Sequence, residues 1–183
     1  MSDNGGALST FFTSVFRSNT KLVSIPENLF KNNPQATDLS YAFKRCFLLS
    51  AVPAGLLKCL PNLTSVYQTF NNCDGLTSIP EGLFDNNTKV RNFTGAFNYC
   101  TKLTSIPEDL FINNTEVTDF SYLFKGCTVL SGRVKIGSHN VTNANEFCAN
   151  CGAITVIVPA GSTTETTFLN VAKSLTNLTV ETF

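Results

Sequence analysis

The chain has 183 residues, of which 43% are hydrophobic and 14% are charged, a balance typical of one folded domain with a buried core. Lysine plus arginine equals aspartate plus glutamate, 13 each, so no net charge favours nucleic acid or an anionic membrane as a partner. No apolar run reaches the roughly 18 residues that a membrane-spanning helix needs, and we expect no membrane insertion.

Residues 1–21 are predicted to form an N-terminal cap that ends in a partial repeat. Residues 1–8 are small and polar and lack the basic and apolar regions of a secretory signal. The run FTSVFRSNTK from Phe12 matches FTGAFNYCTK from Phe93, with Asn19 in the place of Cys100. The partial unit therefore predicts that the repeat begins before residue 22.

Residues 22–153 consist of repeats. Four segments align without gaps at intervals of 27 residues, and a shortened one follows from Leu130. The third reads LTSIPEGLFDNNTKVRNFTGAFNYCTK and the fourth LTSIPEDLFINNTEVTDFSYLFKGCTV. One such unit cannot bury its own apolar face, whereas stacked units place each apolar side chain on its equivalent. The four full repeats begin at Leu22, Leu49, Leu76 and Leu103.

Each repeat is predicted to contain two extended pieces and two short helical turns. The T-x-L-T-S-I stretch is compatible with one parallel strand per coil. The Pro-Glu that follows suits the first turn of a helix, and Asn-Asn at 32–33, 86–87 and 113–114 is predicted to end that turn in a left-handed conformation. A second helical turn carries the recurrent Phe and Cys. We therefore predict an α/β repeat fold, a right-handed leucine-rich-repeat-like solenoid with parallel strands, short helical turns and about 27 residues per coil.

Residues 154–183 are predicted to close the C-terminal end of the array. AITVIVPAGS indicates a strand and a turn, TTETTFLNVAKSL an amphipathic helix, and NLTVETF a final strand. No linker separates this cap from the repeats. Residues 1–183 are thus expected to be a single domain.

The repeated L-T-S-I-P and A-F-x-x-C-T-x-L-T-S patterns resemble BspA-type leucine-rich repeats over roughly residues 12–160. The resemblance implies a scaffold used by bacterial cell-surface or secreted proteins for adhesion, with similar repeats in phage-encoded proteins. A cell-surface or extracellular location is the first expectation. Because no signal or anchoring segment is visible, a virion is the alternative.

The cysteine ladder, together with Cys148 and Cys151, is predicted to consist of buried free thiols rather than disulfides or metal ligands. The ladder formed by one cysteine per repeat lies in the apolar phase, where Cys packs as a small hydrophobe. Cys148 and Cys151 form a lone C-x-x-C with no second pair, and the single histidine, His139, supplies too few further ligands for zinc. We expect no metal and no cofactor. The ladder consists of Cys46, Cys73, Cys100 and Cys127.

Nothing in the sequence predicts catalysis. One histidine without an evident acid or nucleophile partner argues against a triad or a general base. Asp38 and Asp119 share a column, but Ser65 and Asn92 interrupt it, so the six or more oxygens that calcium needs are not indicated, although calcium stays an alternative. The protein is expected not to be an enzyme.

The candidate binding residues are four tyrosines and one arginine in the second halves of the repeats: Tyr41, Tyr67, Arg91, Tyr99 and Tyr122. Stacking places them on one flank, and exposed Tyr and Arg are favoured at interfaces. The competing interpretation is that the tyrosines only cover the turns. We expect a non-enzymatic recognition or adhesion module for a protein or glycan at a bacterial or phage surface. The alternative is a virion fibre or decoration subunit, and a homo-oligomer stays open as a partner.

Overall fold

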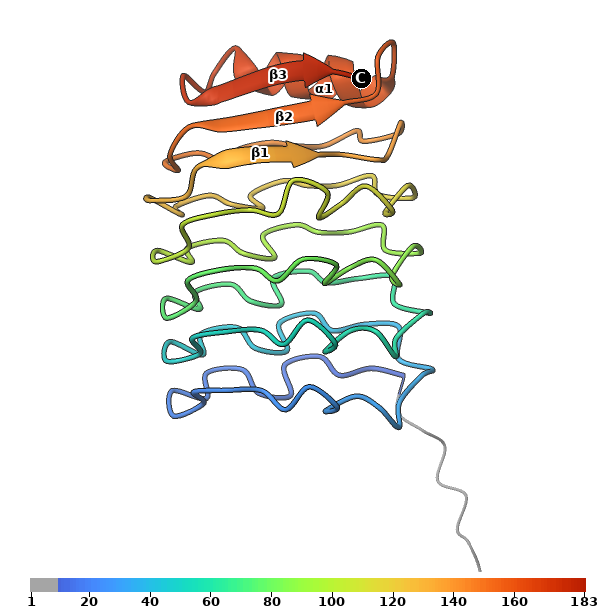
Figure 1. The fold of residues 1–183 in the computed structure, drawn as a ribbon, viewed down its shortest axis with the longest axis vertical. Coiled ribbons are helices and arrows are strands. Elements are labelled where there is room, and N and C mark those ends of the chain that lie inside the picture. Colours follow the sequence, from blue (N-terminus) through green and yellow to red (C-terminus); the bar gives the residue numbers. More distant parts are fainter. Residues whose placement is uncertain (1–9) are drawn as a thin grey trace, which may run out of the picture.

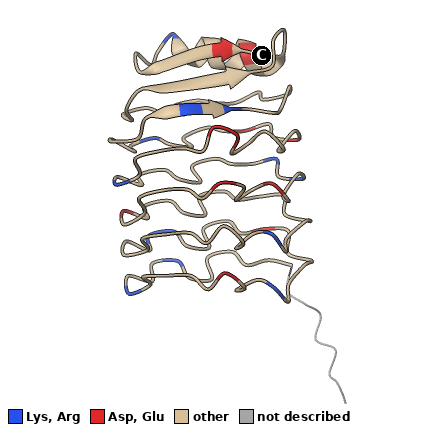
Figure 2. Ribbon diagram, viewed as in Figure 1, with Lys and Arg blue, Asp and Glu red and all other residues tan. Residues whose placement is uncertain are grey.

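The computed structural model describes residues 10–183, in which successive repeats lie one above another along the long axis of the molecule (Figure 1). The first nine residues of the predicted N-terminal cap lie outside the described part. The C-terminus lies at the far end of the stack (Figure 1). Charged residues are sparse along the ribbon, as the composition requires (Figure 2).

Adjacent repeats are held in register by parallel bridges between equivalent residues. One ladder in the second half of the repeats joins Asp38, Ser65, Asn92 and Asp119, and its last step reaches Asn143. A second ladder in the first half joins Ser78 to Ser105 and Ser105 to Ser131. The repeats from 22 to 129 therefore stack at 27-residue intervals, and the shortened last repeat still continues both ladders.

Among the described residues, the helix and the strands longer than a single bridge all lie between residues 132 and 182. Strands β1 (Gly132–Lys135), β2 (Ile154–Val158) and β3 (Leu178–Thr182) form an open parallel sheet in the order β1-β2-β3, with Gly132 opposite Ile154 and Ile154 opposite Leu178. Helix α1 (Thr163–Ala172) lies between β2 and β3 in the chain. The predicted strand, helix and strand of the C-terminal cap are confirmed. Among the described residues, no helix combines the length and hydropathy needed to cross a membrane.

The core is a set of columns in which like side chains meet like. The rings of Phe16, Phe43, Phe70, Phe97 and Phe124 stack with successive centroid distances of 5.3, 5.4, 5.4 and 6.0 Å. Interplanar angles of 3° to 18° keep these rings nearly parallel. Stacking of large, fully buried rings combines area burial with favourable aromatic geometry, so this column forms the centre of the core.

Hydrogen-bonded turns replace the predicted helical turns, and in the second half of each repeat half of the backbone donors that a helix would use bond to the neighbouring repeat. No α-helix occurs within residues 10–153. Instead, Tyr41 N donates to Tyr67 O (2.9 Å) and Phe43 N to Thr69 O (2.9 Å), while Ala42 N donates back to Leu39 O (3.0 Å). Along this segment, one backbone N–H group closes a turn within its own repeat and the next one bonds to a carbonyl of the following repeat. Each predicted strand is likewise reduced to single bridges.

The Asn-Asn pairs do not act as predicted. Among the described residues, none of the asparagines in these pairs has a positive φ. The second asparagine is buried in two repeats and donates its amide to the previous one: Asn87 Nδ2 to Leu57 O and Leu60 O, at 3.1 and 2.8 Å. Asn114 Nδ2 does the same toward Phe84 O and Asn87 O. The role of these asparagines is thus to satisfy carbonyls between repeats.

The cysteine ladder is a second column of bonds between repeats. The thiols of Cys73, Cys100 and Cys127 donate to the carbonyl oxygens of Phe43, Phe70 and Phe97 at 3.2, 3.2 and 3.0 Å. All seven cysteines are free. Burial raises the pKa of the Cys127 thiol to about 12 and holds that of Cys100 well above its ordinary value, so these thiols stay protonated and serve as packed donors.

Helix α1 closes the stack by bonding to backbone groups of the last repeat. Thr164 Oγ1 donates to Ser138 O (2.7 Å) and accepts from Val141 N (3.0 Å), and Thr167 Oγ1 donates to Val141 O (2.8 Å). Phe168 packs edge-on against Phe147, with 5.1 Å between ring centroids. The helix therefore covers polar and apolar groups that another repeat would otherwise cover.

We predict that the free energy of unfolding falls as the pH rises from about 8 to about 10, and falls less in a Cys100→Ala variant. The folded-state pKa values of the buried thiols lie above the unfolded value near 8.5, so in this window the unfolded chain releases protons that the folded protein keeps. Each such thiol contributes a slope of up to about 1.4 kcal/mol per pH unit. Urea unfolding at several pH values measures the slopes, and identical slopes for the two proteins would contradict the assignment.

Candidate ligand-binding flank

Four tyrosines, one in each of four successive repeats, lie on the turns of the second halves: Tyr41, Tyr67, Tyr99 and Tyr122. We call this set the tyrosine flank. Tyr99 and Tyr122 are exposed, at 43% and 36%, whereas Tyr41 and Tyr67 are half-buried. Tyr41 and Tyr122 share one column, whereas Tyr67 lies one place earlier in its repeat and Tyr99 four places later, so the tyrosines share one half of the repeats without forming a continuous column.

Three of these tyrosines occupy backbone positions that disfavour large side chains. Tyr41 and Tyr122 have φ values of 61° and 59°, and Gly95 fills the equivalent place in the third repeat. Tyr99 has φ 56°, where Gly126 stands one repeat later. A non-glycine residue in this region costs on the order of 1 kcal/mol. Ser14, Gln68, Gly95 and Glu146 take the same conformation at the equivalent place in other repeats, so the turn itself does not require tyrosine.

Tyr41 and Tyr67 form a contacting pair. Their ring centroids lie 5.1 Å apart at an interplanar angle of 82°, an edge-to-face arrangement that aromatic rings favour. A hydrogen bond to Tyr67 raises the pKa of the Tyr41 hydroxyl above its ordinary value, and burial adds to the effect. Gln68 Nε2 donates to Tyr67 Oη at 3.1 Å, which fixes the orientation of the pair.

Tyr99 and Tyr122 lie at the other end of the flank. The Tyr99 ring covers Gly126 so closely that a Cβ there would come within 2.5 Å of Tyr99 Cδ1. Lys125 Nζ lies 5.4 Å from the centroid of the Tyr122 ring and 2.6 Å from Glu146 Oε2. The bond to Glu146 raises the pKa of Lys125. The carboxylate of Glu146 therefore compensates the positive charge of Lys125, which lies over the Tyr122 ring.

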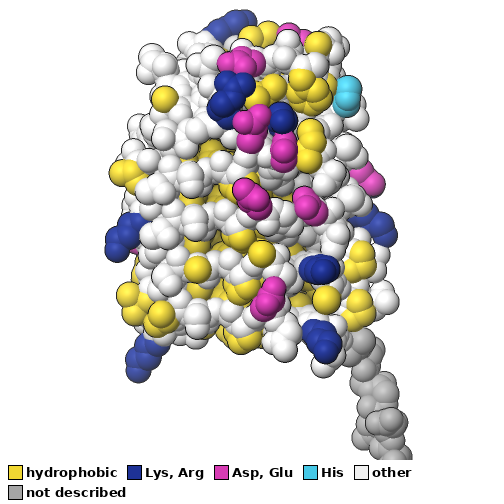
Figure 3. All heavy atoms as spheres, viewed as in Figure 1, with side chains coloured by type: hydrophobic (Ala, Val, Ile, Leu, Met, Phe, Trp, Pro, Cys, Tyr) yellow, Lys and Arg dark blue, Asp and Glu magenta, His cyan; other side chains and the backbone are white. Residues whose placement is uncertain are grey.

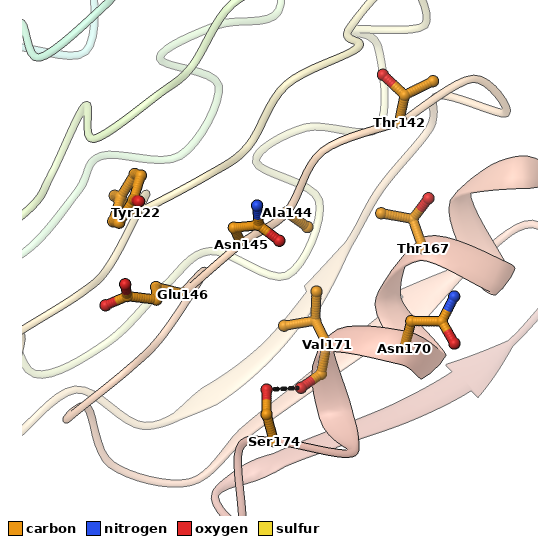
Figure 4. A pocket seen from close by; sticks show the side chains of 9 residues that line it. All are labelled: Tyr122, Thr142, Ala144, Asn145, Glu146, Thr167, Asn170, Val171 and Ser174. Carbon is orange, nitrogen blue, oxygen red and sulfur yellow. Dashed lines mark hydrogen bonds between the residues drawn. The ribbon is translucent and has the colours of Figure 1, made fainter.

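A pocket of about 430 Å³ opens beside Tyr122, between the last repeat and helix α1 (Figure 4). We call it the Tyr122 pocket. Val171 and Ala144 form its floor, since both are almost fully buried. Ser174 Oγ donates to Val171 O at 2.8 Å and thereby caps the end of the helix (Figure 4). The lining residues are Tyr122, Thr142, Ala144, Asn145, Glu146, Thr167, Asn170, Val171 and Ser174.

The pocket combines a partly exposed ring with polar groups of several kinds. Asn145 and Asn170 provide amides that both donate and accept, Thr142 and Ser174 provide hydroxyls, and Glu146 provides a carboxylate. These groups suit a ligand with many hydroxyls and one apolar face.

The predicted site residues are only partly brought together. Tyr41 contacts Tyr67, and Tyr122 lies in the same column as Tyr41 and beside the pocket. Arg91 instead pairs with Glu116, with 2.9 Å between Nη2 and Oε2, and its side chain is 69% exposed. Its backbone bonds to Thr64 O and Thr118 N in the threonine-rich column before the bridge ladder. The guanidinium of Arg91 therefore pairs with the carboxylate of Glu116 and not with the tyrosines.

Sequence reasoning missed the partners of the tyrosines. Arg17 and Lys44 lie over Tyr41, at 5.4 and 5.2 Å from its ring centroid, and Asn145 and Asn170 line the pocket. The A-F-K-R run after Tyr41 and the L-F-K-G run after Tyr122 contain a signal for the lysines, since both place a cation three residues after a tyrosine. Asn170 comes from the cap, and its position depends on how α1 docks.

In the other polar columns, the side chains already make hydrogen bonds within the protein. Oxygens of the Asp38 column accept bonds from the backbone two residues on: Asp38 Oδ1 from Ser40 N (2.7 Å) and Asp119 Oδ1 from Ser121 N (2.8 Å). Within residues 10–183, no group of three or more His, Cys, Asp or Glu side chains could hold a metal ion. Thiols Cys148 and Cys151 share the Asn177 amide, which also binds the carbonyls of both residues.

The face that carries the sheet differs from the tyrosine flank because it contains several ion pairs. Acidic and basic side chains gather near its C-terminal end (Figure 3), where Arg133 pairs with Glu181 (2.7 Å) and Lys135 pairs with Glu108 (3.1 Å) and Asp109 (2.9 Å). Arg133 lowers the pKa of Glu181. These exposed pairs tie the cap strands to the fourth repeat and contribute little each. They are structural contacts rather than a binding site.

No protein-family model matches this sequence, and no curated protein matches it. The likeness to BspA-type leucine-rich repeats therefore depends on the repeats themselves.

We predict that Gly126→Ala destabilises the protein by about 1–3 kcal/mol, because φ is +74° and the added Cβ meets the Tyr99 ring. Gly161→Ala is the matched control, since φ is +69° but nothing lies within 4 Å of its added Cβ. Urea unfolding should show a smaller loss for the control. Equal losses would mean that the Tyr99 contact has no part in the effect.

We predict that Tyr122→Gly changes the free energy of unfolding by less than about 1 kcal/mol, because the relief of the left-handed backbone offsets the lost ring contacts. Tyr67→Gly is the matched variant at a position without positive φ, and it should cost more because no strain is relieved. Thermal or urea unfolding compares them. A Tyr122→Gly variant as unstable as Tyr67→Gly would contradict the strain at Tyr122.

Proposed function

We propose that this protein is a non-enzymatic recognition module, a right-handed leucine-rich-repeat-like solenoid that binds a glycan through the tyrosine flank and the Tyr122 pocket at a bacterial or phage surface. The observation that carries the proposal is the exposed Tyr122 ring beside a pocket lined by amides, hydroxyls and a carboxylate.

A glycan suits the flank better than a folded protein does. A stable protein interface buries roughly 800 Å² on each partner around a hydrophobic centre. On this flank only Tyr99 and Tyr122 are exposed large apolar side chains, and amides, hydroxyls and a carboxylate surround them. A sugar ring presents C–H groups to an aromatic face and hydroxyls to the polar groups at its edge. The mixture of side chains in the Tyr122 pocket supplies both.

The arrangement along the stack also suits an extended ligand. The four tyrosines belong to four successive repeats, whose equivalent rings in the core lie 5.4 to 6.0 Å apart. An oligosaccharide lying along the flank would contact several repeats, and weak contacts in series add to a useful affinity. The resemblance to BspA-type surface proteins supports an adhesive role for such a surface.

The test is a glycan array followed by titration calorimetry with the best oligosaccharide. We expect Tyr122→Gly and Asn145→Ala each to weaken binding by about tenfold, the usual loss when one central contact is removed. Thr77→Ala, on the first half of a repeat and away from the flank, should bind as the unaltered protein does. Circular dichroism confirms that each variant is folded.

Two outcomes would overturn the proposal. One is no binding to any glycan on the array. The other is binding that Thr77→Ala weakens as much as Tyr122→Gly does, because the ligand would then occupy another face.

A further inference from the structure

Three cations surround Tyr41 at the N-terminal end of the flank. Arg17 Cζ and Lys44 Nζ lie 5.4 and 5.2 Å from the ring centroid. Arg45 is adjacent in sequence and, like Arg17, exposed. Lys44 Nζ donates to Gln68 Oε1 at 2.5 Å, which leaves two of its three donors for another acceptor.

These three cations have no carboxylate partner. Arg91, Lys125, Arg133 and Lys135 each have a carboxylate oxygen within 4 Å, whereas none of the described residues supplies one to the three cations round Tyr41. Asp38 is near Tyr41, but its Oδ1 accepts from Ser40 N. Burial lowers the pKa of Lys44, and the charges of Arg17 and Arg45 lower it further. Like charges are thus held together without compensation.

We propose that Arg17, Lys44 and Arg45, gathered round Tyr41, form an anion subsite that takes the sulfate or carboxylate group of an acidic glycan. The inference rests on the proposed function, because the subsite continues the tyrosine flank through Tyr67 and Gln68. Guanidinium groups bind such oxygens with paired hydrogen bonds, and Lys44 adds a point charge. Tyr41 holds Arg17 and Lys44 close to each other, because both cations lie over its ring.

An acidic glycan is the occupant that these residues favour. The chain has no net charge, so it lacks the broad positive field that nucleic acid or an anionic bilayer requires. The cluster is small and contains an aromatic face, which suits one charged sugar rather than a charged surface. We therefore expect a single sulfate or carboxylate to occupy the subsite.

The experiment compares chondroitin sulfate with chemically desulfated chondroitin and with a neutral oligosaccharide from the array. The test variant carries Arg17→Asn, Lys44→Asn and Arg45→Asn, because Asn71, Asn98 and Asn72 already occupy these columns in other repeats. The control carries Lys31→Gln, Lys58→Gln and Lys89→Gln and loses the same charge elsewhere. Binding is measured by calorimetry at about 0.05 M and about 0.5 M salt, which changes the range of charge interactions.

We expect the unaltered protein and the control to bind the sulfated polymer alike, and the test variant to bind it about tenfold more weakly, with less dependence on salt. The neutral oligosaccharide should bind all three proteins equally. Equal loss in the test and control variants would overturn the subsite.

The remaining outcomes separate the two proposals. Binding of neutral glycans alone would overturn the subsite and leave the proposed function intact, while no glycan binding would overturn both. Preferential binding of anionic vesicles, a phosphopeptide or RNA over the sulfated polymer would assign the cluster to another class of partner and overturn the acidic glycan.

Discussion

The structure depends on one constraint: each repeat must present the same backbone and side-chain pattern to the repeat that follows it. The Phe column, the thiol-to-carbonyl bonds and the buried asparagine amides all require equivalent atoms to lie opposite one another. A shift by one residue would break every column at once, because polar donors would then face apolar side chains. The register is held collectively, and no single contact needs to be strong.

The same constraint creates the positions that we connect with function. Bonds to the neighbouring repeat alternate with turns inside the repeat, and this alternation requires left-handed backbone at two positions per repeat, such as those of Tyr41 and Arg45. Side chains at these positions point away from the core columns. The fold therefore fixes the backbone there and leaves the choice of side chain to other requirements.

The sequence predicted the periodic part of the molecule and missed what depends on hydrogen-bond direction. Apolar columns recur at fixed intervals, so the stacked equivalents of Phe43 and Cys73 and the strand-helix-strand order of residues 154–183 could be anticipated. Short helices in the repeats were expected because Pro-Glu is common at helix starts. The structure has turns instead: in the first half they are closed by bonds such as Leu29 N to Pro26 O, and in the second half donors such as Phe43 N bond to the next repeat. Sequence patterns give no account of that competition.

In the candidate site, too, the sequence predicted what recurs from repeat to repeat and missed what depends on contacts in three dimensions. Its tyrosines were found because they recur in one half of the repeat, but Arg91 was grouped with them by sequence position alone, and its guanidinium faces Glu116. The cations round Tyr41 were missed because charge on an exposed turn usually means solvation. What distinguishes them is that Arg17 and Lys44 both lie over the Tyr41 ring, and that proximity is a property of three dimensions. The Tyr122 pocket needs α1, whose docking no repeat column encodes.

Neighbouring repeats also limit one another along the flank. A Cβ on Gly126 would meet the Tyr99 ring, and a Cβ on Gly95 would lie 3.2 Å from Gln68 Cγ. In both cases the large side chain precedes its glycine by one repeat, so it leans over the next repeat rather than over its own. The glycines make room for the side chains before them as well as tolerating the backbone. At these two places a residue larger than glycine would meet the side chain one repeat earlier, so replacing either glycine calls for a smaller side chain there.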